Sequence, residues 1–452
     1  MSLDRFTPPV VGTPSAVNFP LVSRRVLENG LRVWALQNSA VPAVTIVAVI
    51  DAGTSADPAD RPGLASLVAG LVTEGAGPYD AIELSDALAR IGGQLLTEVG
   101  TDVTSVTLTV LAKHFNTGLK LMADVVRRPR MAAPDFDRVR DLRLGRLKQV
   151  SRTPAAAADR ALLTAVYGNH PYAHGSLGTT RATERATLDE VRDWWSVRWR
   201  PVSGAVLLAG DLPPEVAHGA IDAAFGDWPS GVFDPPPLAP PDQTPATAVR
   251  IVHRPGAPQS EIRVGHLGPS RSTPDYYALI GLNAMLGGQF TSRINRNLRE
   301  TRAITYGART GFDMRRAGGL FSCDSSVQAD ATAVALSEVV REMRDIRVDG
   351  AVAFDELDRA RASLTRGYVR YFETAAQLAR AMADLAVHRL PDDTFDRFVP
   401  ELERLTVNDI TTAARTALRP DDAALIVVGD MDVVGKDKDR LGRPVEQASV
   451  EF

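Results

Sequence analysis

His170 and His174 lie four positions apart, and of all the spacings in this sequence theirs is the most similar to that of metal ligands. On a helix, that spacing places both imidazole rings on one face, where they can bind a zinc ion. Pro171 inside the pair and Gly175 after it predict a loop instead, and no glutamate lies between the two histidines. We therefore interpret the pair as ordinary loop residues. The other histidines are spread singly along the chain: His114, His218, His253, His266 and His388.

The composition is that of an ordinary globular protein, with 44% hydrophobic and 23% charged residues. The 51 basic and 55 acidic residues are interspersed, and the net charge is -4, so we expect no basic face and no nucleic acid partner. No apolar run approaches the roughly 20 residues of a membrane span. Cys323 is the only cysteine in the sequence, which excludes an internal disulfide and a cysteine-based metal cluster.

The first nine residues lack the basic segment and the apolar segment of a signal peptide. The sequence therefore predicts a cytoplasmic protein, or a periplasmic one if a leader has been trimmed. A single cysteine fits either redox environment and does not choose between the two compartments.

A proline-rich segment divides the chain nearly in half. It spans residues 232–248, contains six prolines and follows neither the helix nor the strand period, which predicts an extended linker. Short motifs recur on its two sides. Arg200-Pro201 and Arg419-Pro420, each leading into an apolar strand that ends in Gly-Asp, are 219 positions apart. Two further motif pairs recur at offsets of 219 and 218 positions: Thr187 with Thr406, and Phe136 with Phe354.

These repeats predict an α+β protein built from two homologous domains, each a mostly antiparallel sheet covered by helices. In the first half, apolar or alternating runs predict strands at 43–50, 103–110 and 205–209, and longer amphipathic stretches predict helices at 115–127 and 134–149. The predicted boundaries are an N-terminal extension at 1–19, a first domain at 20–231, the linker at 232–248, a second domain at 249–432 and a C-terminal tail at 433–452.

The second half of the sequence contains a motif that resembles the signature of a known family. Residues 286–309 read LGGQFTSRINRNLRETRAITYGAR, with a Gly-Gly turn, Ser-Arg, then Leu-Arg-Glu and a tyrosine seven positions after that arginine. This stretch resembles the C-terminal domain signature of the M16 peptidases, the pitrilysin or inverzincin type. In the first half, the motif at 169–172, Gly178-Thr179 and a hairpin-like opening over 33–54 are similar to the family's N-terminal domain. The resemblance covers roughly residues 20–432 and implies a LuxS/mitochondrial processing peptidase-like fold.

The zinc motif of the active family members is missing. In those members, the first helix of the N-terminal domain carries His-x-x-Glu-His, in which two histidines bind zinc and the glutamate is the general base. The corresponding helix here covers residues 63–71, with Ser66, Ala69 and Gly70 in the three slots. The third ligand, a glutamate, is expected within 140–149, a stretch without any glutamate. The resemblance therefore implies no metal and no cofactor in this chain.

Arg299 and Tyr306 match a second functional motif of the family. The resemblance implies that the arginine binds backbone carbonyl oxygens of the substrate and that the tyrosine hydroxyl donates to the oxyanion near zinc, roles that suit a guanidinium fork and a phenol. In the alternative interpretation, Arg299 forms ion pairs with Glu300 and Asp275, and Tyr306 is a core aromatic residue.

The resemblance implies a non-catalytic subunit of a heterodimeric zinc metallopeptidase, inactive alone. Its partner would be an M16 subunit that carries the His-x-x-Glu-His motif and the zinc, and its substrate would be an unfolded peptide. The alternative is a purely structural, core-type subunit of an assembly with no peptidase role. An independent peptidase with other metal ligands is a third interpretation. The first and third predict proteolysis, whereas the second predicts none with any partner.

Overall fold

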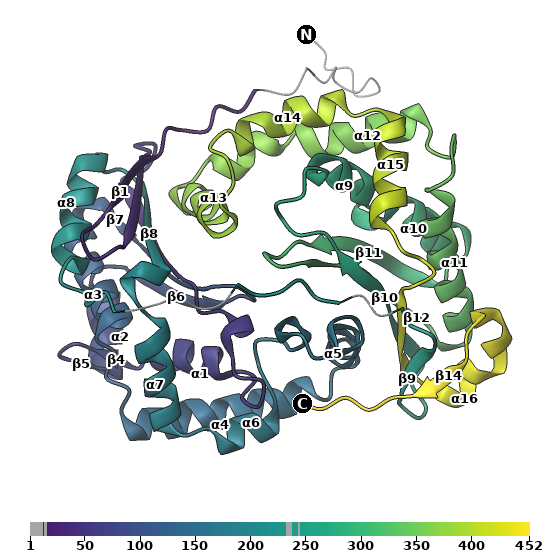
Figure 1. Ribbon diagram of the computed structural model, residues 1–452, viewed down its shortest axis with the longest axis horizontal. Coiled ribbons are helices and arrows are strands. Elements are labelled where there is room, and N and C mark those ends of the chain that lie inside the picture. The colour runs from purple at the N-terminus through teal and green to yellow at the C-terminus, as the bar shows by residue number, and fades with distance from the viewer. Residues whose placement is uncertain (1–11, 13–15, 232–236, 243–244) are drawn as a thin grey trace, which may run out of the picture.

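The computed structural model describes residues 12, 16–231, 237–242 and 245–452. The predicted N-terminal extension therefore lies mostly outside the described residues, and so does part of the predicted linker. The described residues form two sheets of six strands, one in each half of the chain, with helices packed on both faces (Figure 1). In this part of the chain, no helix is long and apolar enough to span a membrane.

The first sheet has the strand order β1-β2-β8-β3-β7-β6, and all neighbours are antiparallel except β2 and β8. Its strands are β1 (Ser23–Val26), β2 (Arg32–Gln37), β3 (Ala43–Ile50), β6 (Gln94–Val99), β7 (Thr104–Leu111) and β8 (Gly204–Gly210); β4 (Gly75–Ala76) and β5 (Tyr79–Asp80) form a separate ribbon. Strand β3 is apolar except for Thr45, because both of its faces are covered: Ile46 and Ala48 pack into one core, and Val47 and Val49 pack into another.

The second sheet has the strand order β11-β12-β10-β13-β9-β14. Its strands are β9 (Val249–His253), β10 (Gln259–Gly268), β11 (Thr305–Asp313), β12 (Gly319–Gln328), β13 (Ala424–Gly429) and β14 (Val445–Gln447). Five strands of each half occur in the same spatial order, and each pair of neighbours has the same relative direction in both halves. We propose on this basis that 20–231 and 249–432 are two homologous domains that arose by duplication.

Helices cover the outer face of each sheet. The first half contains α1 (Leu64–Leu71), α2 (Ala81–Arg90), α3 (Phe115–Arg127), α4 (Ala133–Val150), α5 (Pro154–Tyr167), α6 (Thr180–Arg185), α7 (Leu188–Arg198) and α8 (Pro214–Phe225). The second half contains α9 (Tyr276–Asn283), α10 (Arg293–Asn295), α11 (Thr332–Asp345), α12 (Phe354–Thr365), α13 (Ala375–His388), α14 (Thr394–Arg404), α15 (Val407–Ala417) and α16 (Met431–Val434).

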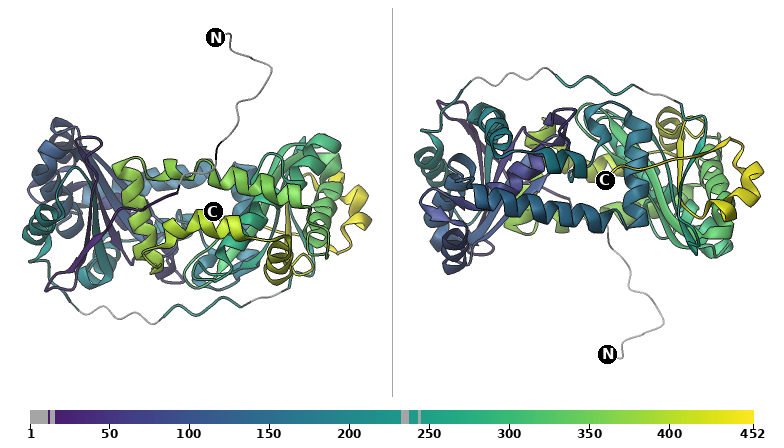
Figure 2. Two further views of the ribbon diagram at one scale, coloured as in Figure 1. Left: turned by 90° about the horizontal axis from the view of Figure 1, so that it is seen from above. Right: turned by 90° about the horizontal axis from the view of Figure 1, so that it is seen from below.

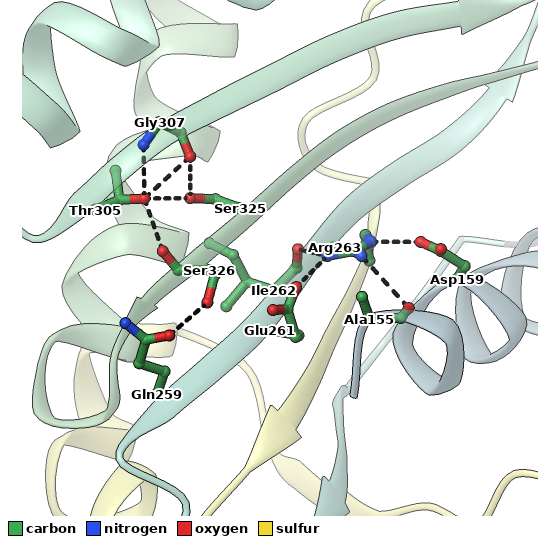
Figure 3. Close-up of polar contacts among 10 residues, drawn as sticks. All are labelled: Ala155, Asp159, Gln259, Glu261, Ile262, Arg263, Thr305, Gly307, Ser325 and Ser326. Carbon is green, nitrogen blue, oxygen red and sulfur yellow. Dashed lines mark hydrogen bonds and ion pairs between the residues drawn. The ribbon is translucent and has the colours of Figure 1, made fainter. Parts of the chain in front are cut away.

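The two halves exchange one helix each. Leu378 and Met382 of α13, in the second half, pack on the inner face of the first sheet. In return, Leu162 of α5, in the first half, packs on the inner face of the second sheet. Arg263 of β10 fixes this second contact, because its Nε donates to Asp159 of α5 at 2.6 Å (Figure 3). Figure 1 shows α13 and α5 crossing to the opposite halves.

The predicted strands and helices are present, and their ends differ from the predicted ones by at most one residue. The predicted hairpin-like opening over 33–54 is wrong. Strands β2 and β3 follow each other in the chain, but β8 lies between them, parallel to β2 and antiparallel to β3. The sequence of β8 is apolar at every position, so it is stable only at the centre of a covered sheet. The described parts of the linker, 237–242 and 245–248, have no helix or strand, and the linker runs along one side of the molecule (Figure 2).

Candidate functional site

Tyr306 lies on β11, the edge strand of the second sheet, and its side chain is 93% exposed. The pairing of β11 with β12 shifts between Thr305 and Ala308, so that the strand carries one extra residue, a β-bulge, at this point. Thr305 fixes the bulge: its Oγ1 accepts from the N–H of Gly307 at 3.1 Å and lies 3.0 Å from Oγ of Ser325 (Figure 3). The bulge therefore turns Tyr306 into solvent at a free sheet edge.

Arg299 lies seven residues before Tyr306, in the π-helical turn Arg296–Thr301. Turns of this kind are rare, and they frequently occur at functional sites. The guanidinium carbon of Arg299 lies 3.7 Å from the centroid of the Phe290 ring. Among the described residues, the Arg299 side chain has no hydrogen bond or ion pair, and its Nη1 atom is buried without an acceptor. The side chain thus keeps its donors unpaired.

Ser66, Ala69 and Gly70 lie on α1, which packs tightly between β6 and α4. The carbonyl of Ala69 accepts from Thr97 Oγ1 of β6 at 3.2 Å. The carbonyl of Ser66 accepts from Arg143 Nη2 of α4 at 2.7 Å. A Cβ atom on Gly70 would lie 3.2 Å from Val139 of α4, so little room is left on that side of the helix.

The charges around α1 do not suit a metal ion. The Arg143 guanidinium lies against the helix, and burial lowers the pKa of Arg143 to about 10. Asp57 is also buried, and it accepts from the N–H groups of Gly63 and Ala65 at the start of α1, each at 2.7 Å. Burial raises the pKa of Asp57 to about 7. A divalent cation beside α1 would be repelled by the guanidinium. Within the described ranges, no group of three or more His, Cys, Asp or Glu residues could hold a metal ion.

Two models of the same family match the chain. The model described as "Insulinase (Peptidase family M16)" matches residues 32–180, and the model described as "Peptidase M16 inactive domain" matches residues 185–364. The chain belongs to the M16 peptidase family. The second match begins before the proline-rich segment, so its start falls inside the predicted first domain.

Individual M16 relatives match most of the chain. An uncharacterized zinc protease of Mycobacterium tuberculosis is 24% identical over 403 residues, which cover 87% of this chain and 90% of the relative. A non-peptidase homolog of Helicobacter pylori is 19% identical with the same coverage of both chains. The crystal structure of a peptidase M16 inactive domain from Pseudomonas fluorescens has a TM-score of 0.84 at 24% identity, covering 91% of this chain and 98% of that one.

The position of α1 explains how this M16 chain differs from active members of its family. Ser66, Ala69 and Gly70 provide no imidazole or carboxylate, and the expected acidic ligand on α4 is replaced by a stretch whose Arg143 contacts α1. Zinc in a catalytic site needs three protein ligands. Both halves match the family, and the zinc-ligand motif of its active members is missing from this sequence.

The histidines at 170 and 174 lie around a single 3₁₀ turn, Pro171–Ala173, in agreement with the predicted loop. His170 bonds through Nε2 to the carbonyl of Ala239 at 2.9 Å, and its Nδ1 accepts from the N–H of Tyr172 at 3.1 Å. Both ring nitrogens of His170 are thus used within the protein. The ring nitrogen Nδ1 of His174 lies 3.4 Å from the carbonyl of Gly175.

The Tyr172 hydroxyl forms hydrogen bonds at the contact between the two halves, which the sequence did not predict and which we call the latch. The hydroxyl donates to Asp102 Oδ1 at 2.5 Å and accepts from the N–H of Ala317 at 3.2 Å. Asp102 also accepts from the N–H of Arg316 at 3.0 Å, and the Arg316 side chain pairs with Asp51 at 2.8 Å. The turn between β11 and β12 is therefore anchored to the first half.

The alternative roles predicted for Arg299 and Tyr306, which we call the clamp residues, are wrong. Tyr306 is exposed and is not a core aromatic residue. Arg299 forms no ion pair with Glu300 or Asp275 among the described residues, and it contacts Phe290 instead.

Sequence reasoning missed Asn295. Its Nδ2 donates to Ala308 and Gln289 carbonyls at 2.8 and 3.0 Å, and its Oδ1 accepts from the Ala308 N–H at 2.8 Å. The sequence signal that could have identified Asn295 is its position between the Gly-Gly pair and Arg299, inside the family motif.

Proposed function

We propose that this chain is the non-catalytic subunit of a heterodimeric zinc metallopeptidase and that it supplies Arg299 and Tyr306 to the active site of a partner with an intact His-x-x-Glu-His motif. One observation carries the proposal. The chain presents an exposed phenol on a bulged edge strand and, seven residues earlier, an arginine without an acceptor, although its sequence lacks the His-x-x-Glu-His motif.

Two free sheet edges support an extended peptide as the substrate. Strands β6 and β11 end the strand order of their sheets, and both expose unpaired backbone groups. A peptide that adds as a strand to such an edge gains main-chain hydrogen bonds whatever its side chains are. An unfolded segment suits this mode of binding, because its backbone groups are free to pair, whereas most backbone groups of a folded protein are already paired.

Each clamp residue has a role that its chemistry fits. The guanidinium of Arg299 donates to carbonyl oxygens of the bound peptide in a fixed, planar geometry. The hydroxyl of Tyr306 donates to the oxygen that becomes negative when the scissile carbonyl is attacked. Zinc, held by the partner, would supply the activated water.

The test combines the purified chain with an M16 subunit of the same genome that carries the intact motif, and measures cleavage of an unfolded, internally quenched peptide. Loss of one oxyanion donor typically costs about 10² to 10³ in turnover, so Tyr306→Phe should lower kcat by that factor. Arg299→Ala should mainly raise KM. Tyr371→Phe is the matched control, since Tyr371 is also exposed, and it should leave both constants unchanged.

The structural alternative makes the opposite prediction. A core-type subunit without a peptidase role would give assembled complexes in which Arg299→Ala and Tyr306→Phe cleave the peptide as fast as the unmodified chain. Assembly is measured separately, by size-exclusion chromatography, so that a lost complex is not mistaken for a lost clamp.

A further inference from the structure

Phe290 lies two residues after the π-helical segment Ala284–Gly288, which contains the Gly-Gly pair, and its side chain is 64% exposed. Burial of a phenylalanine side chain stabilises a fold by about 1.5 to 3 kcal/mol, so an exposed ring gives up most of that contribution. What the ring does contact is the guanidinium of Arg299, whose central carbon lies 3.7 Å from the ring centroid. The contact places a cation over the face of an aromatic ring, within the range of an attractive cation–π interaction.

The ring restrains Arg299 without using its donors. A carboxylate partner would neutralise the guanidinium and occupy its N–H groups. A ring covers one face of the planar group and leaves the N–H donors along its edges, where carbonyl oxygens bind. The buried Nη1 of Arg299 has no acceptor, and the same holds for Nε2 of Gln289, next to Phe290 in sequence. Two buried donors in one segment thus lack acceptors in the free protein.

The turn that carries Phe290 is tied to the strand that carries Tyr306. Asn295 donates from Nδ2 to the carbonyl of Gln289 at 3.0 Å and to the carbonyl of Ala308 at 2.8 Å. Its Oδ1 accepts from the N–H of Ala308 at 2.8 Å. One buried side chain therefore sets the distance between the Phe290 turn and the end of the Tyr306 bulge.

We infer that Phe290 is a positioning residue of the peptide clamp: its ring holds the Arg299 guanidinium in one orientation, with the donor edges left for the carbonyl oxygens of an extended peptide. This inference rests on the proposed function. Because an arginine side chain loses about 2 kcal/mol of rotamer entropy on being fixed, a ring that restrains it beforehand leaves less to be lost on binding.

The test is a double-mutant cycle on the full-length chain. The probe is a fluorescein-labelled, unstructured peptide of 15 residues, blocked at both ends, and binding is followed by fluorescence anisotropy. A cation–π contact of this kind corresponds to roughly 3- to 30-fold in affinity, so Phe290→Leu should raise Kd by that factor. Phe290→Trp keeps an aromatic face and should restore binding. Phe354→Leu, a change at an equally exposed ring on α12, should leave Kd unchanged.

The decisive measurement is Phe290→Leu in the Arg299→Ala background, where it should have no further effect because the ring acts through the guanidinium. An equal loss in both backgrounds, or an unchanged Kd for Phe290→Leu alone, would overturn the positioning role while leaving the clamp itself intact. If Arg299→Ala does not alter binding, or the unmodified chain does not bind the peptide, the proposed function is what fails.

Discussion

Replacement of Tyr172 by phenylalanine removes a single oxygen atom from the contact between the two halves. The lost hydroxyl donates to the Asp102 carboxylate and accepts from the N–H of Ala317. A hydrogen bond to a charged group contributes about 1.5 to 3 kcal/mol, and a buried N–H left without an acceptor costs about 1 to 3 kcal/mol. Asp102 keeps its bond from the N–H of Arg316, so its carboxylate is not left unpaired. We expect Tyr172→Phe to lower the free energy of unfolding by about 2 to 4 kcal/mol.

The assay is equilibrium urea unfolding, followed by far-UV and near-UV circular dichroism together, so that loss of the contact between the halves is seen as a change in midpoint rather than in slope. Tyr371→Phe is the control, because the Tyr371 side chain is exposed, and it should change the free energy by less than about 0.5 kcal/mol. In the Asp102→Ala background, Tyr172→Phe should cost clearly less. A loss below about 0.5 kcal/mol, or strict additivity with Asp102→Ala, would refute the latch.

Three further outcomes are expected. Burial lowers the pKa of His266 to about 4, and its Nε2 already accepts from the N–H of Arg419. The contribution of neutral His266 to the free energy of unfolding is therefore complete above pH 6.5, and about 3 kcal/mol of it is lost as the pH falls from 6.5 to 4. Urea titrations at several pH values should show that the free energy of unfolding depends more steeply on pH in the unmodified protein than in His266→Gln. Arg143→Met should destabilise the fold by about 1.5 to 3 kcal/mol, whereas Arg146→Met, on the exposed side of the same helix, should not; equal midpoints for both would contradict the contact with α1. After dialysis, elemental analysis should give far less than one zinc per chain, and a ratio near one would contradict the account of α1.

The sequence predicted those parts of the fold that local periodicity determines. Strand β3 has the predicted bounds because it is a continuous, nearly apolar run, and helix α3 has them because its apolar residues follow a clear helix period. The place of β8 could not be predicted, since it pairs with strands more than 150 residues earlier, and no local pattern records such a distance. The hairpin-like opening was a local interpretation of a non-local pairing.

For the candidate site too, some features could be predicted from the sequence and others could not. Arg299 and Tyr306 were found because their spacing belongs to a motif, but the exposure of Tyr306 depends on a bulge, which is a matter of register between two strands. The contact of Arg299 with Phe290 depends on side-chain orientation in a π-helical turn, and helix periodicity does not describe it. The guanidinium of Arg143 beside α1 likewise follows from the packing of two helices.

The exchange of α5 and α13 makes each half the missing core layer of the other. If the backbone were cut within 237–242, where the chain has no helix or strand, the two fragments would still bury the inner faces of each other's sheets, as the subunits of a domain-swapped dimer do. Neither fragment alone would cover the inner side of its own sheet. The two halves of the chain therefore depend on each other as the subunits of an obligate dimer do, although they belong to one polypeptide. The linker raises the effective concentration of each half for the other, whereas the packing of α5 and α13 sets their arrangement.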